Sequence, residues 1–222
     1  RGIGAAIRRR LIADGGSVSF TSASTGVAAH ARERSYLTPD VRAVDWDALL
    51  DDAEAALGPV DALVNNAGII GVLAPFVETD PATVREVFDV NVHAAFELSQ
   101  AAVRRWIVRG TGGVIVNLSS IAATTGAPGE YVGYAASKAA VEAMTRGLGK
   151  ELAPHGIRVV AVSPGTTRTD IHVPGRVERV AARVPMGRVA EPEEIAAAVV
   201  WALSPAASYV SGTTISVAGA AG

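Results

Sequence analysis

The stretch GVIVNLSS at residues 113–120 is almost continuously apolar and ends in two serines. A second stretch of this kind, IRVVAVSPG at residues 157–165, ends in a serine, a proline and a glycine. Near-continuous apolar character is typical of strands in a parallel sheet, because helices cover both faces of such a sheet. The two stretches therefore predict two buried strands of a parallel sheet.

Helical and strand patterns alternate along the rest of the chain. Apolar residues recur at Ile3, Ile7 and Leu11, as one face of a helix requires. Further helices are predicted over residues 23–34, 47–57, 81–109, 131–153 and from 191 onward, and further strands over 17–22, 41–44, 60–68 and 212–219. This order predicts one α/β domain over residues 1–222, a doubly wound Rossmann-type fold whose open parallel sheet carries helices on both faces.

Composition narrows the classes of partner. The net charge of −2 gives no electrostatic reason to expect nucleic acid or an anionic membrane. The longest strongly apolar stretch, residues 195–203, is far shorter than the roughly 20 residues that span a bilayer. The absence of cysteine excludes disulfides and fits a cytoplasmic protein. The four histidines show no metal-ligand spacing, so no metal is expected.

Polar and glycine-rich segments follow several of the predicted strands. Ligands of open parallel sheets bind at the carboxyl ends of the strands, where the strand order reverses. The segments at these ends are Ser22, Asp45, residues 65–68, residues 119–120 and residues 163–169. We expect the ligand site to be built from them.

The stretch EYVGYAASKAAVEAM at residues 130–144 combines two tyrosines with one lysine. On a helix, Tyr134 and Lys138 are one turn apart, whereas Tyr131 lies about 10 Å from Lys138 along the axis. An isolated pair with this spacing is usually a surface feature, but this one follows a buried strand that ends in two serines. A nearby cation lowers the pKa of a phenol, which can then exchange a proton with a carbonyl or alcohol oxygen. The spacing predicts that Lys138 lowers the pKa of Tyr134 and not that of Tyr131.

Seven short motifs, taken in their order along the chain, resemble those of the short-chain dehydrogenase/reductase family over essentially the whole length. The motifs are RGIG (1–4), NNAG (65–68), NV (91–92), NLSS (117–120), YAASK (134–138), SPG (163–165) and GRVAEPEEIA (188–197). The stretch GAPGEYVGYAASK (126–138) is similar to bacterial oxidoreductases of the 3-oxoacyl-carrier-protein reductase-like and sugar dehydrogenase-like kinds.

The resemblance implies roles for four catalytic residues. Tyr134 would be the general acid/base, and Lys138 would lower its pKa and bond the nicotinamide ribose. Ser120 would hold the substrate oxygen, while Ser119 would face the other way, because adjacent strand residues point to opposite faces. Asn91 would hold a water that links Lys138 to solvent.

The resemblance also implies a nicotinamide cofactor. Gly2 and Gly4 match the last two glycines of the family's T-G-x-x-x-G-x-G motif, so a first strand with the first glycine is expected before residue 1. The end of the second family strand, FTSAS (20–24), has no acid, and Arg1 could face a 2′-phosphate; NADP is therefore expected over NAD. The predicted cofactor-binding set is Arg1, Gly2, Ile3, Gly4, Ser22, Asp45, Asn65, Ala67, Gly68, Tyr134, Lys138, Pro164, Gly165, Thr167 and Thr169.

Together these motifs predict an NADP(H)-dependent oxidoreductase that interconverts a small-molecule carbonyl and a secondary alcohol. The alternatives are an NAD-linked sugar, polyol or steroid dehydrogenase, and a non-catalytic nucleotide-sensing relative, which would be expected to lose the tyrosine or the lysine. Tyr131 fits either the mouth of the substrate site or a partly exposed helix start. Arg104, Arg105 and Arg109 fit either a basic patch or a solvated helix face.

A homotetramer is expected from two helices. The helix at 135–152 is rich in small residues, and the helix at 81–109 carries Phe96, Val103 and Trp106 as more apolar surface than one sheet face can cover. A symmetric partner would bury both helices. The resemblance implies a second interface through residues 191–203 and the last strand.

Overall fold

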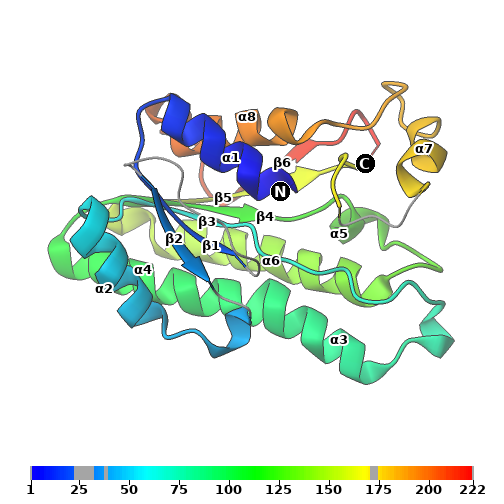
Figure 1. Ribbon diagram of the computed structural model, residues 1–222, viewed down its shortest axis with the longest axis horizontal. Helices are drawn as coiled ribbons and strands as arrows, with labels where there is room; N and C mark the ends of the chain where they lie inside the picture. The colour runs from blue at the N-terminus through cyan, green and yellow to red at the C-terminus, as the bar shows by residue number, and fades with distance from the viewer. Residues whose placement is uncertain (1, 23–32, 38–39, 171–174, 222) are drawn as a thin grey trace.

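The computed structural model describes residues 2–22, 33–37, 40–170 and 175–221, and Figure 1 shows their arrangement. Strands β3 (Ala62–Asn65), β4 (Gly113–Leu118), β5 (Ile157–Pro164) and β6 (Thr213–Val217) form one parallel sheet in this order. Strands β1 (Val18–Ser22) and β2 (Glu33–Leu37) form a second, two-stranded parallel sheet. The α/β fold with parallel strands is confirmed, although the described strands form two hydrogen-bonded groups instead of one sheet.

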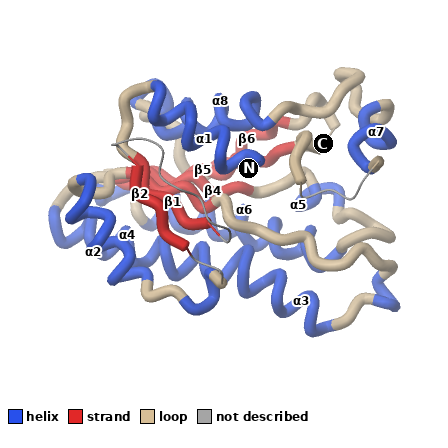
Figure 2. The backbone as a smooth tube through the Cα atoms, viewed as in Figure 1, coloured by secondary structure: helices blue, strands red, loops and turns tan. Residues whose placement is uncertain are grey.

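Helices cover both faces of the strands, which form the middle band in Figure 2. On one face lie α1 (Gly2–Ala13) and α8 (Pro192–Leu203), which pack on each other. On the other face lie α2 (Trp46–Leu57), α4 (Ala94–Arg109) and α6 (Val132–Glu151). Shorter helices are α3 (Pro81–Phe88), α5 (Ala122–Thr125) and α7 (Arg176–Ala181), with 3₁₀ turns at Val41–Ala43, Phe76–Glu78, Ala153–His155 and Pro205–Ala207.

Each face of the sheet has its own apolar core, and alternation along β4 shows why. Ile115 packs among the residues beneath α2, α4 and α6, whereas Val116 and Leu118 pack beneath α1 and α8. Successive side chains of a strand point to opposite faces, so a strand buried on both sides must be apolar at nearly every position. The predicted burial of 113–120 and 157–165 is confirmed by β4 and β5 over most of their lengths.

Two predicted elements near the second sheet are wrong. Residues 41–44 are not a strand: Val41–Ala43 form a 3₁₀ turn, because the Asp40 side chain accepts a hydrogen bond from the Arg42 backbone N–H at 2.9 Å and favours a local turn. The helix predicted over 23–34 cannot extend to its end, because Glu33 and Arg34 pair with β1 as part of β2. Residues 23–32 of that predicted helix lie outside the described residues.

The long helix predicted over 81–109 is interrupted by one wide turn. Between α3 and α4, residues Asp89–His93 adopt a π-helix, with a backbone bond from Ala94 N–H to Asp89 C=O. Asn91 lies within this turn and is 2% exposed. A π turn inside an α-helix is a frequent sign of a functional position.

Contacts of α4 correct one expectation and bear on one alternative that the sequence left open. Trp106 is 1% exposed and donates its indole N–H to the Val60 carbonyl at 2.7 Å, so it belongs to the core and not to an outer apolar surface. Arg105 and Arg109 pair with carboxylates of α2, namely Asp47, Asp51 and Glu54. The two guanidinium groups are thus neutralised between helices and form no basic patch.

Candidate active site

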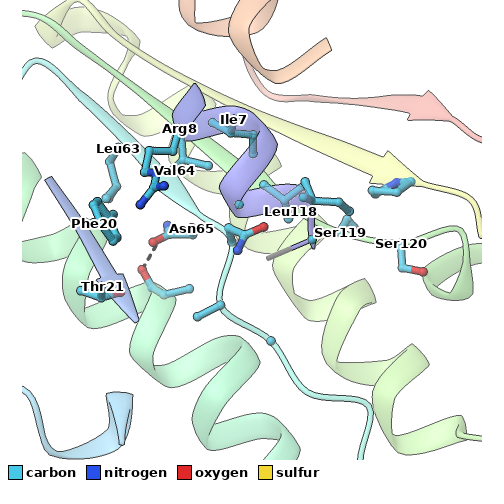
Figure 3. A pocket seen from close by; sticks show the side chains of 18 of the residues that line it. Ile7, Arg8, Phe20, Thr21, Leu63, Val64, Asn65, Leu118, Ser119 and Ser120 are labelled. Atoms are coloured by element: carbon cyan, nitrogen blue, oxygen red, sulfur yellow. Dashed lines mark hydrogen bonds between the residues drawn. The ribbon is translucent and has the colours of Figure 1, made fainter. Parts of the chain in front are cut away.

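The carboxyl ends of β3, β4 and β5 open onto one cavity, which also reaches the N-terminus of α1. Figure 3 shows part of its wall, including Asn65 on β3 and the serines that follow β4. The predicted residues that line it are Gly2, Ile3, Gly4, Asn65, Ala67, Gly68, Ser120, Tyr134, Lys138, Pro164, Gly165, Thr167 and Thr169. Segments more than 160 residues apart in the chain therefore meet at the place that strand-end reasoning indicates.

Three of the predicted cofactor residues stand apart from this set. Asp45 is the N-cap of α2, where its carboxylate accepts a hydrogen bond from the Ala48 N–H at 2.9 Å, and it does not line the cavity. Asp45 thus has a local structural role, and its expected contact with the cofactor stays a prediction. Ser22 is the last residue of β1, and the structure describes its backbone only. Arg1 lies outside the described residues.

Tyr134 and Ser120 come together at the end of the cavity near α5. Tyr134 lies in the first turn of α6, with its hydroxyl close enough to Ser120 for the serine to influence its pKa. Burial raises the pKa of Tyr134 to about 12, and Ser120 opposes this rise only in part. The expected lowering of the Tyr134 pKa is therefore wrong for the structure as it stands, because loss of hydration penalises the phenolate more than its neighbours favour it.

Lys138 lies one turn beyond Tyr134 and is 4% exposed. Its Nζ donates to the Leu118 carbonyl at 2.7 Å and lies 5.7 Å from the centroid of the Tyr134 ring. Burial lowers the pKa of this ammonium to about 8. The lysine is thus held on the backbone of β4, with its ammonium over the ring of Tyr134.

Tyr131 lines the same cavity and stands edge-to-face with Tyr134, with ring centroids 5.5 Å apart. It precedes the first residue of α6, which puts it at the rim of the site. Both interpretations left open by the sequence describe Tyr131, which is a partly exposed residue at the helix start and also lines the cavity.

Asn91 clamps the turn after β3 to α6. Its side chain accepts from the Ile69 N–H at 2.8 Å and donates to the Ile69 carbonyl at 3.0 Å. It also donates to Ser137 Oγ at 3.0 Å, and Ser137 in turn donates to the Tyr134 carbonyl at 2.7 Å. Asn91 therefore fixes the backbone beside Tyr134, while its expected water-holding role stays a prediction.

Glycines provide the remaining walls, and a side chain would be crowded at Gly4 and Gly68. A Cβ on Gly68 would lie 3.2 Å from Asn91 Oδ1 and 3.4 Å from Lys138 Nζ. A Cβ on Gly4 would lie 2.6 Å from the Asn66 amide nitrogen. Gly2 has a φ of 65°, a conformation that glycine adopts readily. Bare backbone beside a helix N-terminus suits a pyrophosphate, so the residues present fit a dinucleotide.

The comparisons with known proteins agree with this geometry. A family model described as enoyl-(acyl carrier protein) reductase matches residues 1–220. The chain belongs to the short-chain dehydrogenase/reductase family. It is 39% identical to a 3alpha-hydroxysteroid dehydrogenase of Mediterraneibacter gnavus, over 100% of this chain and 93% of that protein. Members of this family are enzymes that act on CH–OH groups with NAD(P).

Two solved structures share the fold. A blue fluorescent protein from a metagenomic library, in complex with NADPH, has a TM-score of 0.86 and 32% identity, covering 100% of this chain and 94% of its own. A 3-ketoacyl-(acyl-carrier-protein) reductase from Brucella melitensis, complexed with NADH, has a TM-score of 0.91 and 27% identity, covering 99% and 93%.

Within the described ranges, no helix is long and apolar enough to cross a membrane. The same part of the chain holds no group of three or more histidine, cysteine, aspartate or glutamate side chains suited to a metal ion.

Some site residues of this dehydrogenase/reductase escaped the sequence reasoning. Asn66, the second residue of NNAG, fills the space beside Gly4, and the repeated asparagine was its only signal. Asn65 donates to Asn117 Oδ1 at 2.8 Å, and Asn117 donates to Thr145 Oγ1 at 2.9 Å. This buried chain ties β3 and β4 to α6, a pairing that sequence spacing does not disclose.

Proposed function

We propose that the protein is an NADP(H)-dependent oxidoreductase that interconverts a carbonyl and a secondary alcohol, with Tyr134 as general acid/base. The observation that carries the proposal is that Ser120, Tyr134 and Lys138 line one cavity, with Tyr134 beside Ser120 and one helical turn from the buried Lys138. Two hydroxyls that share one end of a cavity can both bond a single carbonyl oxygen, which places that oxygen for proton transfer.

The residues divide the work of the reaction. Ser120 would orient the substrate oxygen, and Tyr134 would give it a proton as the carbonyl becomes an alcohol. A phenol with a pKa of about 12 is protonated at neutral pH and is therefore ready to donate. The Lys138 ammonium would stabilise the negative charge left on the tyrosine. The bound nicotinamide would supply the hydride.

The walls beside these residues would hold the cofactor. Gly2 and Gly4 at the start of α1 would receive the pyrophosphate, and Ala67 and Gly68 the adenosine ribose. Pro164, Gly165, Thr167 and Thr169, which follow or end β5, would face the nicotinamide. The Thr169 side chain already reaches within 3.5 Å of the Cβ position of Gly2, so the α1 turn and the β5 loop meet in one wall.

A preference for NADP over NAD has two supports. The segment at the end of β1 carries no acid that would repel a 2′-phosphate, and a structural relative at 32% identity binds NADPH. Fluorescence titration with NADPH and NADH tests the preference. Tighter binding of NADH would overturn it.

The substrate class can be tested with one ketone from each class considered above: a steroid, a sugar and a 3-oxoacyl thioester. A panel of a 3-ketosteroid, a ketopentose and acetoacetyl-CoA, followed by NADPH absorbance, is expected to include at least one substrate of the wild-type protein. The steroid relative favours the first of these and supports a steroid dehydrogenase as the second candidate. If the wild-type protein binds NADPH but reduces no member of the panel, the proposed carbonyl chemistry fails for these three classes.

We also propose a homotetramer. Phe96, Ile107 and Val108 on α4 are 48%, 42% and 87% exposed, and Trp201 on α8 is 43% exposed. Covering two such helices with symmetric partners would bury this apolar surface at about 25 cal/mol per Å². Light scattering on the purified protein tests the proposal, and a monomeric mass at micromolar concentration would contradict it.

A further inference from the structure

Glu142 is a buried carboxylate that the proposed reaction does not use. It lies on α6 one turn beyond Lys138 and is 8% exposed. Its Oε1 accepts a hydrogen bond from Ser119 Oγ at 2.8 Å, and its Oε2 lies 4.0 Å from Arg146 Nη1. Burying a carboxylate is costly unless it is hydrogen-bonded, so its position on this face requires an explanation.

The partner of Glu142 belongs to the peptide unit on which Lys138 rests. The carbonyl of that unit, Leu118 C=O, accepts from Lys138 Nζ at 2.7 Å. The N–H of the same unit, on Ser119, donates to the Val162 carbonyl of β5 at 2.7 Å. Ser119 Oγ also lies 3.4 Å from the Lys138 carbonyl. The Leu118–Ser119 peptide unit is thus hydrogen-bonded to β5 and to the Lys138 side chain, and the adjoining Ser119 side chain bonds residues of α6.

This peptide unit lies just beyond the last residue of β4 that pairs with β3. The pairing of β3 with β4 ends at Asn117, so beyond this residue β4 has a strand neighbour only on the β5 side. Ser119 is 4% exposed and bonds Glu142 on α6, whereas the next residue, Ser120, lies beside Tyr134 at the cavity wall. Rotation of the chain at Ser119 would move both the lysine's acceptor and the serine at the cavity wall.

We infer that Glu142 is a positioning residue for the reaction, acting through Ser119. By holding the Ser119 hydroxyl, it fixes the Leu118 carbonyl under Lys138 and turns Ser120 toward Tyr134. The inference rests on the proposed function, because it assigns a purpose only if Tyr134, Ser120 and Lys138 perform the chemistry.

The test compares variants that remove or keep the acceptor. Glu142→Ala and Ser119→Ala each remove the bond, whereas Glu142→Gln keeps an oxygen that can accept from the serine hydroxyl. The double variant Ser119→Ala/Glu142→Ala asks whether both residues act through one interaction. Glu151→Gln, an exposed carboxylate at the end of the same helix, is the matched control.

We expect kcat for a ketone that the wild-type enzyme reduces to fall roughly 10- to 100-fold in both alanine variants. The KM and the Kd for NADPH should change little, because the proposed contacts to the cofactor and the substrate oxygen are assigned to other residues. Glu142→Gln should recover most of kcat, and the double variant should lose no more than the single ones. Thermal unfolding and NADPH binding report whether each variant is folded; if Glu142→Ala is not, Ser119→Ala and Glu142→Gln carry the comparison.

The outcomes separate this inference from the proposed function. If Tyr134→Phe is inactive while the alanine variants keep kcat within about twofold of wild type, the positioning role is refuted and the proposed function stands. A loss of thermal stability in the alanine variants with unchanged kcat would likewise reduce Glu142 to a packing role. Full activity of Tyr134→Phe would refute the proposed function itself.

Discussion

The two ends of the cavity are built in opposite ways. Where β4 meets α6, Ser119 and Lys138 are each held by side-chain hydrogen bonds of 2.7–3.4 Å. Where α1 meets the turn after β3, the decisive feature is the lack of side chains at Gly2 and Gly4, and Gly68 adjoins both ends because it lies beside Asn91 and Lys138. The first end is suited to moving a proton between fixed atoms, and the second to receiving a ligand by its backbone. Substitutions should therefore affect catalysis at one end and cofactor binding at the other.

The largest effect is expected at the α6 end. Tyr134→Phe removes the hydroxyl beside Ser120 and should lower kcat by about 10²–10⁴-fold, the usual contribution of a general acid/base. Its Kd for NADPH should stay near the wild-type value. Tyr131→Phe keeps the ring that stands against Tyr134 and should retain most of the activity. Steady-state kinetics measure kcat for both variants. Equal losses of kcat would contradict the assignment of the acid/base role to Tyr134 alone.

A second prediction concerns the cost of burying Lys138. Its pKa of about 8 in the folded protein lies below the ordinary 10.5, so between these values the unfolded chain binds more protons at this residue than the folded one. The free energy of unfolding should therefore rise with pH across this window, by at most about 1.4 kcal/mol per pH unit from this group. Tyr134, with its raised pKa, opposes this only above its ordinary value of 10.0.

Urea unfolding at pH 8, 9 and 10 measures this dependence. Lys138→Met should flatten the rise relative to the wild-type protein, because it removes the titrating group. Lys150→Met changes an exposed lysine of the same helix and should leave the rise intact. Parallel curves for wild type and Lys138→Met would show that the buried ammonium carries no such cost.

The smallest expected effect tests the glycine-walled end. Gly68→Ala places a methyl group within 3.2 Å of Asn91 Oδ1 and 3.4 Å of Lys138 Nζ, so one of them must shift. We expect kcat/KM to fall roughly 10-fold, equivalent to about 1.4 kcal/mol, together with weaker NADPH binding. Gly147→Ala is the control: its Cβ meets nothing within 4 Å, and alanine in a helix should be neutral or stabilising. Equal behaviour of the two variants would remove the steric argument.

The sequence predicted the α6 end better than its surroundings. A four-residue spacing on a helix is local, so Tyr134 and Lys138 could be paired from their positions alone, and strand-end reasoning brought Ser120 to them. The Lys138 contact with Leu118 C=O and the Glu142 contact with Ser119 could not be predicted, because each depends on how far α6 is shifted along β4. The direction of the Tyr134 pKa was missed for the same reason: the spacing reveals the cation but not the lost hydration.

Local side-chain bonding explains the errors outside the site. Residues 41–44 have the composition of a strand, but Asp40 and Arg42 close a turn on themselves. Asp45 follows the predicted strand over residues 41–44, and its carboxylate caps α2. In both places a short-range hydrogen bond of an aspartate decides the backbone, which hydrophobic patterning does not register.

The π turn at Asp89–His93 sets the angular phase between two helices. A wide turn accommodates one residue more than an α turn, so the faces of α3 and α4 are offset by about 100° from an uninterrupted α-helix. Val87 before the turn and Ala94 after it are both buried, at 2% and 6% exposed. Deleting a single residue there would let the helix run through unbroken, and it would then rotate one of the two helices out of the core and withdraw Asn91 from Ile69. The number of residues in the turn at Asp89–His93 is therefore constrained as strictly as their identity.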